Sequence, residues 1–348
     1  SFLVYDLLHR YLVWSGYNVR FVMNLTDVDD KTILKAAEAG ETIKEYTGPF
    51  GKQILEDAEE LGILPAEAYP LATDYIEEMI SWTQRLIENG MAYSTADGSV
   101  YFSIGSFPEY GRLKGLDLET ATTVSRVDSD EYEKEDVRDF VLWKTTKSID
   151  EKVEASWDSP WGRGRPGWHL ECSVMSEKYL GKHFDIHGGG IDLIFPHHEN
   201  EIAQSCVHNE TKKFANYWVH NGFVTMKKEK MSKSLKNIIT IEEASKKYSG
   251  QVVRLSLLSA QYKQPLDWSN ELLLEQSKTL DKWYTMYSSE FSKTTPDCFK
   301  DLLDDMNTPL YISKLHDLFT QSQNGNVEKI KEFNKACRLI GLFHETKE

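Results

Sequence analysis

The spacing of apolar residues predicts a chain in which helices alternate with short strands. Residues 1–15 have one apolar helical face, formed by Val4, Leu8, Tyr11 and Leu12. Gly16 lies where this helix would end. The apolar run at 19–23 predicts a strand, and the acidic pair at 29–30 suits the first turn of a second helix. Helix, strand and helix in this order predict an α/β fold with a parallel sheet.

In the middle of the chain the pattern changes from long helices to short strands. We expect two helices, separated by a break at Pro65 and Pro70, at residues 42–63 and 72–90. Short apolar strands are expected at 100–102 and 140–143, on either side of an acidic stretch at 128–137 that we interpret as a solvated loop. We therefore predict a subdomain inserted into the α/β core.

The α/β pattern returns after a linker at 159–167, which is rich in Gly, Pro and Arg. A strand at 183–186 is expected to run into a glycine turn, and Pro196 to begin the next helix. Four further helices are expected, at residues 241–260, 270–290, 308–322 and 326–341. The predicted parts are thus core (1–79), insertion (80–165), core (166–225), a lysine loop with connecting helices (226–280) and the start of a helical bundle (281–348).

Composition and charge narrow the class of protein. The 348 residues are 40% hydrophobic, and we find no apolar run long enough to span a membrane, so we expect a soluble protein. Four widely scattered cysteines favour a reducing cytoplasm, with free thiols or a metal ligand, over a disulfide scaffold. The net charge of −15 argues against general nucleic-acid affinity. Residues 227–236, however, hold five lysines against one glutamate, which suits an anionic ligand held at one place.

The lysine loop contains the most specific motif, Lys-Met-Ser-Lys-Ser at 230–234. Lys230 and Lys233 can neutralise charge that moves during phosphoryl chemistry, and Ser232 and Ser234 can donate to phosphate oxygens. An ordinary lysine cluster would be a solvated surface, but this pentapeptide is rarely met by chance. The motif therefore predicts an ATP site.

Three glycines between a strand and a helix predict a second part of a nucleotide site. Gly188, Gly189 and Gly190 would let the backbone approach a nucleotide closely, and Asp192 could accept hydrogen bonds from ribose hydroxyls. A tight turn without function is the alternative for these glycines alone.

Two segments offer metal ligands. Pro196 at the start of a helix would place His197 and Glu201 one turn apart, where both can bind zinc. A surface helix without metal is an equally good interpretation of this segment alone. A protease motif of the H-E-x-x-H type is excluded, because Ile202 stands where the second histidine must be. Cys172 would be an ordinary core thiol by itself, yet it could supply a third ligand.

Several segments together resemble the cysteinyl-tRNA synthetases, which are class I aminoacyl-tRNA synthetases. They are NLTDVDDK at 24–31, GRPGWHLECS at 164–173, FDIHGGGIDLIFPHHENEIAQS at 184–205 and KMSKS at 230–234. The resemblance implies a Rossmann-like catalytic core, a cytoplasmic and monomeric enzyme, and ATP-dependent transfer of cysteine to tRNA(Cys). ATP would enter with Mg²⁺.

The resemblance also implies roles for single residues. Cys172, His197 and Glu201 match ligands of a zinc ion that binds the thiol of the substrate. Thr26 and Trp168 match positions near the bound cysteine, and the lysines of the loop match groups that stabilise the leaving pyrophosphate. A metal that selects a thiol makes a separate editing domain unnecessary.

Two features of the family have no counterpart here, a first zinc cysteine and a HIGH-type ATP signature. Both would precede Ser1, and the distal anticodon-reading module would follow Glu348, so we expect the chain by itself to be inactive. Two other functions remain open. One is a related ligase that joins cysteine to an amino sugar, and the other is a synthetase-like binding protein without catalysis.

Overall fold

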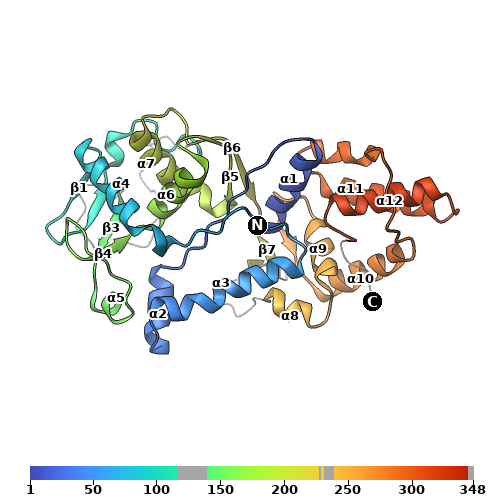
Figure 1. Ribbon diagram of the computed structural model, residues 1–348, viewed down its shortest axis with the longest axis horizontal. Helices are drawn as coiled ribbons and strands as arrows, with labels where there is room; N and C mark the ends of the chain where they lie inside the picture. Colours follow the sequence, from blue (N-terminus) through green and yellow to red (C-terminus); the bar gives the residue numbers. More distant parts are fainter. Residues whose placement is uncertain (116–138, 227–228, 231–238, 344–348) are drawn as a thin grey trace. The chain divides into compact units, whose positions relative to one another are not determined.

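The computed structural model describes residues 1–348 except 116–138, 227–228, 231–238 and 344–348 (Figure 1). The chain forms two compact units. One consists of Ser1–Val19, Ile54–Pro65 and His220–Glu348, and the other of Arg20–Gln53 and Ala66–Val219. The acidic stretch predicted as a solvated loop lies outside the described residues. Within the described ranges, no helix combines the length and the apolar character that a membrane span needs.

The second unit contains an antiparallel sheet in the order β1-β2-β3-β4. Its strands are Ala92–Ser94, Val100–Phe102, Phe140–Thr145 and Gly164–Pro166. The strands expected at 100–102 and 140–143 are thus β2 and β3. The predicted linker at 159–167 was partly wrong, because residues 164–166 form β4 and pair with β3. Gly164 permits this pairing, since a Cβ there would collide with the carbonyl oxygen of Lys144.

The following helices lie in this unit, α3 only as far as Gln53, and most of them contribute to a core shared with the sheet. They are α2 (Asp30–Ala39), α3 (Ile43–Glu60), η1 (Ala72–Tyr75), α4 (Ile76–Glu88), α5 (Ser148–Lys152), α6 (Trp168–Leu180) and α7 (Glu199–Asn209). The acidic residues expected at the start of α2 are confirmed there. Asp29 caps the helix by accepting a hydrogen bond from the backbone of Thr32. Met79, Leu86 and Leu142 are among the fully buried side chains of the core.

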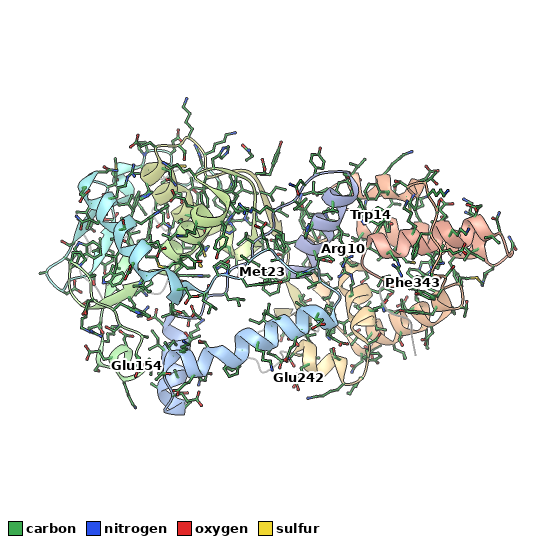
Figure 2. All side chains as sticks on the ribbon, viewed as in Figure 1. Arg10, Trp14, Met23, Glu154, Glu242 and Phe343 are labelled. Carbon is green, nitrogen blue, oxygen red and sulfur yellow. The ribbon has the colours of Figure 1, made fainter. Side chains whose placement is uncertain are left out.

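The predicted strand at 19–23 is an extended segment rather than a regular strand. It makes two isolated parallel bridges, Val22 to Ala68 and Leu25 to Leu71. The backbone amides of Met23 and Leu25 donate to the carbonyls of Ala68 and Pro70. Glu67 and Ala72 donate back to the carbonyls of Phe21 and Leu25. Between these two bonds, the carbonyl of Met23 (labelled in Figure 2) receives none from Pro70, which has no N–H to donate. Proline thus interrupts the ladder that the apolar run predicts.

Two paired strands, β5 (Phe184–Gly190) and β6 (Ala215–Asn221), complete the second unit. β5 is followed by a short 3₁₀ turn, η3 (Ile191–Leu193), and by a π turn, η4 (Ile194–His198), which leads into α7. Regular α-helix therefore begins at Glu199 rather than at Pro196, because Phe195 has an extended backbone and one wide turn follows it.

The first unit is mainly helical. Its helices are α1 (Phe2–Trp14), α8 (Ile241–Ser245), α9 (Gly250–Leu258), α10 (Asn270–Tyr284), η5 (Asp297–Leu303), α11 (Thr308–Ser322) and α12 (Val327–Leu339). A small sheet orders β8 (Glu229–Lys230), β7 (Val224–Met226) and β9 (Leu266–Asp267). The single helix expected at 241–260 is two helices, α8 and α9. The first residue of α9, Gly250, packs so closely on Glu60 that a Cβ there would collide with the carbonyl oxygen of Glu60.

A buried arginine joins the three chain segments of the first unit. Arg254 is fully buried and forms an ion pair with Asp6. Its guanidinium also donates to the carbonyls of Ile340 (2.7 Å), Leu61 (3.1 Å) and Gly62 (3.2 Å). Burial lowers the pKa of Arg254 to about 10, although Asp6 acts in the opposite direction. The fully buried face of α1 is Leu3, Asp6 and Leu7, while the apolar face expected from its sequence is only half-buried.

Candidate functional site

Three side chains that the sequence marks as metal ligands converge in the second unit. Cys172 lies on α6, His197 in η4 and Glu201 on α7. Their sulfur, nitrogen and oxygen atoms all lie within 4.8 Å of one another. Nε2 of His197 is 3.7 Å from Oε1 of Glu201, which is about the separation of two ligands on a tetrahedral ion. The group can therefore hold a metal ion.

Buried hydrogen bonds between α6 and α7 fix the distance between these ligands. The Gln204 amide donates to Oγ of Ser173 and to the carbonyl of His169, both at 2.6 Å. The Ser205 hydroxyl lies 2.8 Å from Oγ of Ser173. Ser173 follows Cys172, and Gln204 is three residues from Glu201. The two helices thus carry their ligands on adjoining faces.

A second group of possible ligands shares the same carboxylate. His187, His198 and Glu201 also lie within 4.8 Å of one another. Nε2 of His187 is 3.1 Å from Oε2 of Glu201, whereas Oε1 of Glu201 is buried without a hydrogen-bond partner. The orphaned oxygen is the one that faces His197, so the first group has the stronger requirement for an ion.

The surroundings of His197 and Cys172 favour the uncharged form of each side chain. Burial lowers the pKa of His197 well below its ordinary range, so the imidazole is neutral. Burial also raises the pKa of the Cys172 thiol, with the carboxylate of Glu201 as a second cause. A thiolate is costly in this place unless a cation accompanies it, which a metal ion would provide.

Asn24 and Trp168 lie beside the metal-ligand group of Cys172, His197 and Glu201. Nδ2 of Asn24 donates to Sγ of Cys172 at 3.6 Å, which brings the loop of Thr26 close to the metal-ligand group. Thr26 itself is exposed. The indole of Trp168 is 45% exposed and its centroid lies 4.2 Å from that of the His197 ring. An accessible aromatic wall beside the ligands is what a small bound molecule would touch.

The three glycines belong to β5 and not to the turn that the sequence predicts. Gly189 and Gly190 are needed because the following segment folds back closely upon the strand. A Cβ at Gly189 would be 2.8 Å from Cε1 of His198 and from Cδ1 of Leu193, and a Cβ at Gly190 would strike the carboxylate of Asp192. Gly188 and Asp192 are both exposed. The absence of a side chain at Gly189 thus leaves room for the ring of His198, and the backbone at Gly188 is accessible.

Replacing Gly189 with alanine is expected to destabilise the second unit by about 1–3 kcal/mol, because two packed side chains must move. Urea unfolding would measure the change. Gly48→Ala is the matched control, since a Cβ at Gly48 meets nothing within 4 Å. It should alter stability by less than about 1 kcal/mol. Equal midpoints for the two variants would contradict the packing role of Gly189.

The lysine loop is described only at its start. The backbone of Lys230 pairs with Thr225 in the hairpin of β7 and β8. Ser232, Lys233 and Ser234 lie outside the described residues, so the predicted roles of these residues stay predictions.

The sequence reasoning missed Asn24, His187 and His198 as neighbours of the ligands. His187 stands directly before the three glycines, and His198 follows His197, so both were near recognised motifs. Asn24 begins one of the segments that carry the resemblance. Only the folded chain shows that all three contact the same group.

Comparison with known proteins shows the family of the chain. Residues 1–279 match the family model described as tRNA synthetases class I (C) catalytic domain. The cysteine–tRNA ligase of Pelagibacter ubique is 47% identical over 349 residues, which cover 99% of this chain and 76% of that protein. The cysteine–tRNA ligase of Methylobacillus flagellatus is also 47% identical, over 97% of this chain and 75% of its own length.

Solved structures of class I synthetases share the fold. Methionyl-tRNA synthetase of Mycobacterium tuberculosis superposes with a TM-score of 0.66 at 13% identity and covers 97% of this chain and 85% of its own. A putative arginyl-tRNA synthetase of Campylobacter jejuni gives a TM-score of 0.57 at 15% identity, over 100% of this chain and 89% of that one. The Rossmann-like class I fold predicted from the sequence is confirmed. The resemblance read from four short motifs is confirmed as well, over nearly the full length: the chain belongs to the class I tRNA synthetases, in the family of the cysteine–tRNA ligases.

Proposed function

We propose that this protein activates cysteine with ATP and transfers it to tRNA(Cys), and that Cys172, His197 and Glu201 hold a zinc ion at which the substrate thiol is selected. In the first step a carboxylate oxygen of cysteine attacks the α-phosphorus of ATP and pyrophosphate leaves. In the second a hydroxyl of the 3′-terminal ribose attacks the carbonyl carbon and AMP leaves.

The convergence of the three ligands carries this proposal. One sulfur, one nitrogen and one oxygen ligand from three elements suit zinc, which also prefers a thiolate as a further ligand. Zinc would supply the distinction between cysteine and serine, because a hydroxyl is a much poorer ligand for this donor set. The buried Oε1 of Glu201 without a protein partner fits such a role.

The chain's own side chains would hold the substrate around this point. Trp168 presents an exposed ring beside His197, and Asn24 keeps the loop of Thr26 against Cys172. Gln204 and Ser205 hold α7 on α6. These contacts position the amino acid, and positioning is the main source of rate in adenylate formation.

ATP would use the glycines of β5, and Mg²⁺ would accompany it. Gly188 and Asp192 are exposed for backbone and ribose contacts. Lys230 and Lys233, with Ser232 and Ser234, would neutralise the pyrophosphate as it leaves. We also propose that the protein is a monomer and that it acts in a reducing cytoplasm. The four free thiols of the chain support the second of these proposals.

Lys233→Ala is expected to slow cysteine-dependent exchange of pyrophosphate into ATP by about 100-fold, while cysteine binding changes little. The lysine would act only on charge that develops during the reaction. Exchange kinetics of the intact protein, with calorimetric titration of cysteine, would measure both. Lys236→Ala removes the same charge outside the motif and is the control. An equal loss in binding and rate would refute the phosphate role.

Two rival functions predict different products. The amino-sugar ligase would consume cysteine and ATP but leave tRNA uncharged. A binding protein would consume neither cysteine nor ATP and would modify neither acceptor. The curated relatives described above carry the name cysteine–tRNA ligase, which favours the tRNA. Incubating the intact protein with labelled cysteine and ATP, and with either purified tRNA or an amino-sugar acceptor, would separate the three. Label recovered only on the amino sugar would overturn the proposal.

A further inference from the structure

A turn in the second unit is attached to the helix that carries the ligand Glu201. Residues 109–114, which we call the strap, follow the short helix η2 (Ile104–Ser106) and form consecutive turns outside any helix or strand. Leu113 of the strap packs against the apolar cluster that contains Ile202 and Cys206 of α7. Connecting turns usually lie loosely on the surface of a protein, so further attachments of the strap to α7 would indicate a role for it.

The start of α7 holds the strap through two buried polar side chains. The Glu199 carboxylate is 0% exposed and accepts hydrogen bonds from the backbone amides of Gly111 at 3.1 Å and Lys114 at 2.8 Å. The hydroxyl of Tyr110, which is also buried, donates to Oδ1 of Asn200. The bonds of Gly111 and Tyr110 are shielded from water, where a broken hydrogen bond leaves a costly unpaired group.

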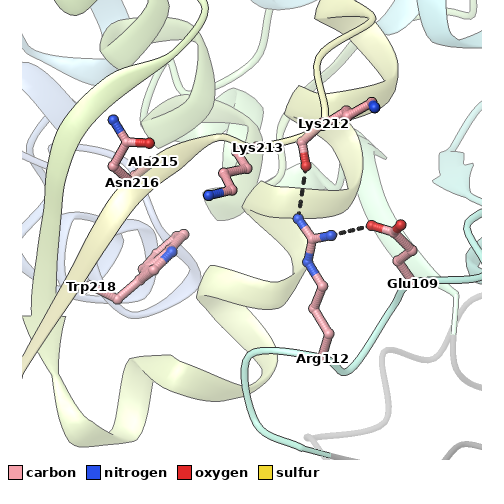
Figure 3. Close-up of a pocket in the computed structure, with 7 residues that line it drawn as sticks. All are labelled: Glu109, Arg112, Lys212, Lys213, Ala215, Asn216 and Trp218. Carbon is pink, nitrogen blue, oxygen red and sulfur yellow. Dashed lines mark hydrogen bonds and ion pairs between the residues drawn. The ribbon is translucent and has the colours of Figure 1, made fainter.

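A third attachment lies just beyond the other end of α7. The Arg112 guanidinium donates to the carbonyl of Lys212 at 2.9 Å and pairs with Glu109 of the strap itself, as Figure 3 shows. Since α7 ends at Asn209, the strap is fastened at the first residues of the helix and again past its last residue. The helix therefore cannot shift along its axis without breaking one of these attachments.

The strap holds the part of the chain that connects two metal ligands. The two residues of α7 that bind it stand between His197 and Glu201 in the sequence. His197 belongs to η4, in which Phe195 has an extended backbone, so regular helical hydrogen bonds do not fix this turn. The ring of Tyr110 meets that of Phe195 edge to face, with centroids 6.3 Å apart. The strap thus contacts the irregular turn on both sides of His197.

We infer that the strap positions the metal ligands, by holding His197 at the separation from Glu201 that a metal ion needs. This separation is 3.7 Å between Nε2 of His197 and Oε1 of Glu201. Tyr110 and Glu199 are then positioning residues, because each acts through the ligands. Metal sites tolerate little change in the positions of their ligands, so releasing the strap should weaken metal binding. The inference rests on the proposed zinc site.

The test is Tyr110→Phe in the intact protein, which removes the hydroxyl bound to Asn200 and keeps the ring. Its dissociation constant for zinc should rise about tenfold, at the lower end of the roughly 10–100-fold effect of losing an outer-shell partner. Competition with a chromogenic chelator would measure it. With Co²⁺ in place of zinc, the visible spectrum should shift, because it follows the arrangement of the ligands around the ion.

Glu199→Gln is a second variant that releases the strap at another point. Its zinc affinity should fall at least as much, because the NH₂ group of glutamine cannot accept the hydrogen bond that one carboxylate oxygen accepts. Zinc bound as tightly by both variants as by the unaltered protein would overturn the inference.

Tyr93→Phe is the matched control in the same unit. It removes a hydroxyl that donates to Asp139 at 2.8 Å, from strand β1, which carries none of the three ligands. Its zinc affinity and cobalt spectrum should equal those of the unaltered protein. An equal loss of zinc affinity in Tyr93→Phe and Tyr110→Phe would show only a general loss of stability and would overturn the inference. If the unaltered protein binds neither zinc nor cobalt, the proposed zinc site fails and the inference with it.

Discussion

Cys172→Ala is expected to remove bound zinc and to lower cysteine-dependent pyrophosphate exchange more than about 100-fold. Loss of an outer-shell partner of a metal ligand costs about 10–100-fold, and a direct ligand should cost more. The variant leaves His197 and Glu201 facing each other at 3.7 Å, with Oε1 of Glu201 buried and still unpartnered. Elemental analysis by mass spectrometry would report the metal, and exchange kinetics of the intact protein the activity.

Cys206→Ala gives the matched control for this prediction. Cys206 lies on α7, is 4% exposed and belongs to neither group of possible ligands. Its replacement should leave both metal content and exchange unchanged. The ligand assignment would be wrong if Cys172→Ala kept its zinc, or if both variants lost it. Loss of exchange with zinc retained would instead place Cys172 in direct contact with substrate.

Arg254→Met is expected to destabilise the first unit by about 3–5 kcal/mol, the usual result of breaking a buried ion pair. The variant removes the guanidinium that donates to the backbone carbonyls of Ile340 and Leu61. It also removes one partner of the Asp6 carboxylate. Asp6 keeps Arg10, whose Nε lies 2.9 Å away, so it is not left entirely alone. The carbonyls have no such substitute. Urea unfolding followed by circular dichroism would measure the loss.

The control for this prediction is Arg20→Met. Arg20 pairs with Glu67 at 2.7 Å, but the side chains are 59% and 50% exposed. Exposed pairs contribute about 0–1 kcal/mol, so the same chemical change should cost little. Arg254→Lys is a second variant, which keeps the charge but loses the planar fork, and it should remain destabilised. A lysine variant as stable as the original would mean that charge alone matters at this position.

The candidate site was largely predictable because two of its ligands follow a local rule. One helical turn separates His197 from Glu201, and the resemblance to a known family, rather than any local pattern, marks Cys172. The roles of His187 and Asn24 were not predictable, because each touches the site from another part of the chain. Tertiary packing decides such contacts, and no periodicity in the sequence reports them.

The fold shows the same division between local and distant causes. α11 was predicted at 308–322 and is found as Thr308–Ser322, where the Asn307 side chain caps the first turn. The strand at 19–23 was overestimated, because its partner segment contains Pro70 and the interruption comes from that residue. β4 was taken for a linker, since a strand of three residues with Gly and Pro resembles a turn until it is paired.

The connections of Arg254 also set the order in which the protein can fold during its synthesis. Asp6 and Arg254 are 248 positions apart, so at about 5–20 residues per second the ribosome adds the arginine roughly 12–50 s after the aspartate. During that interval Asp6 has Arg10 on its own helix but lacks the fully buried guanidinium of Arg254. The unit that bears the metal ligands is complete once Val219 has emerged. We therefore expect the metal-ligand group to assemble on the nascent chain before α1 gains its contacts with Arg254 and α12.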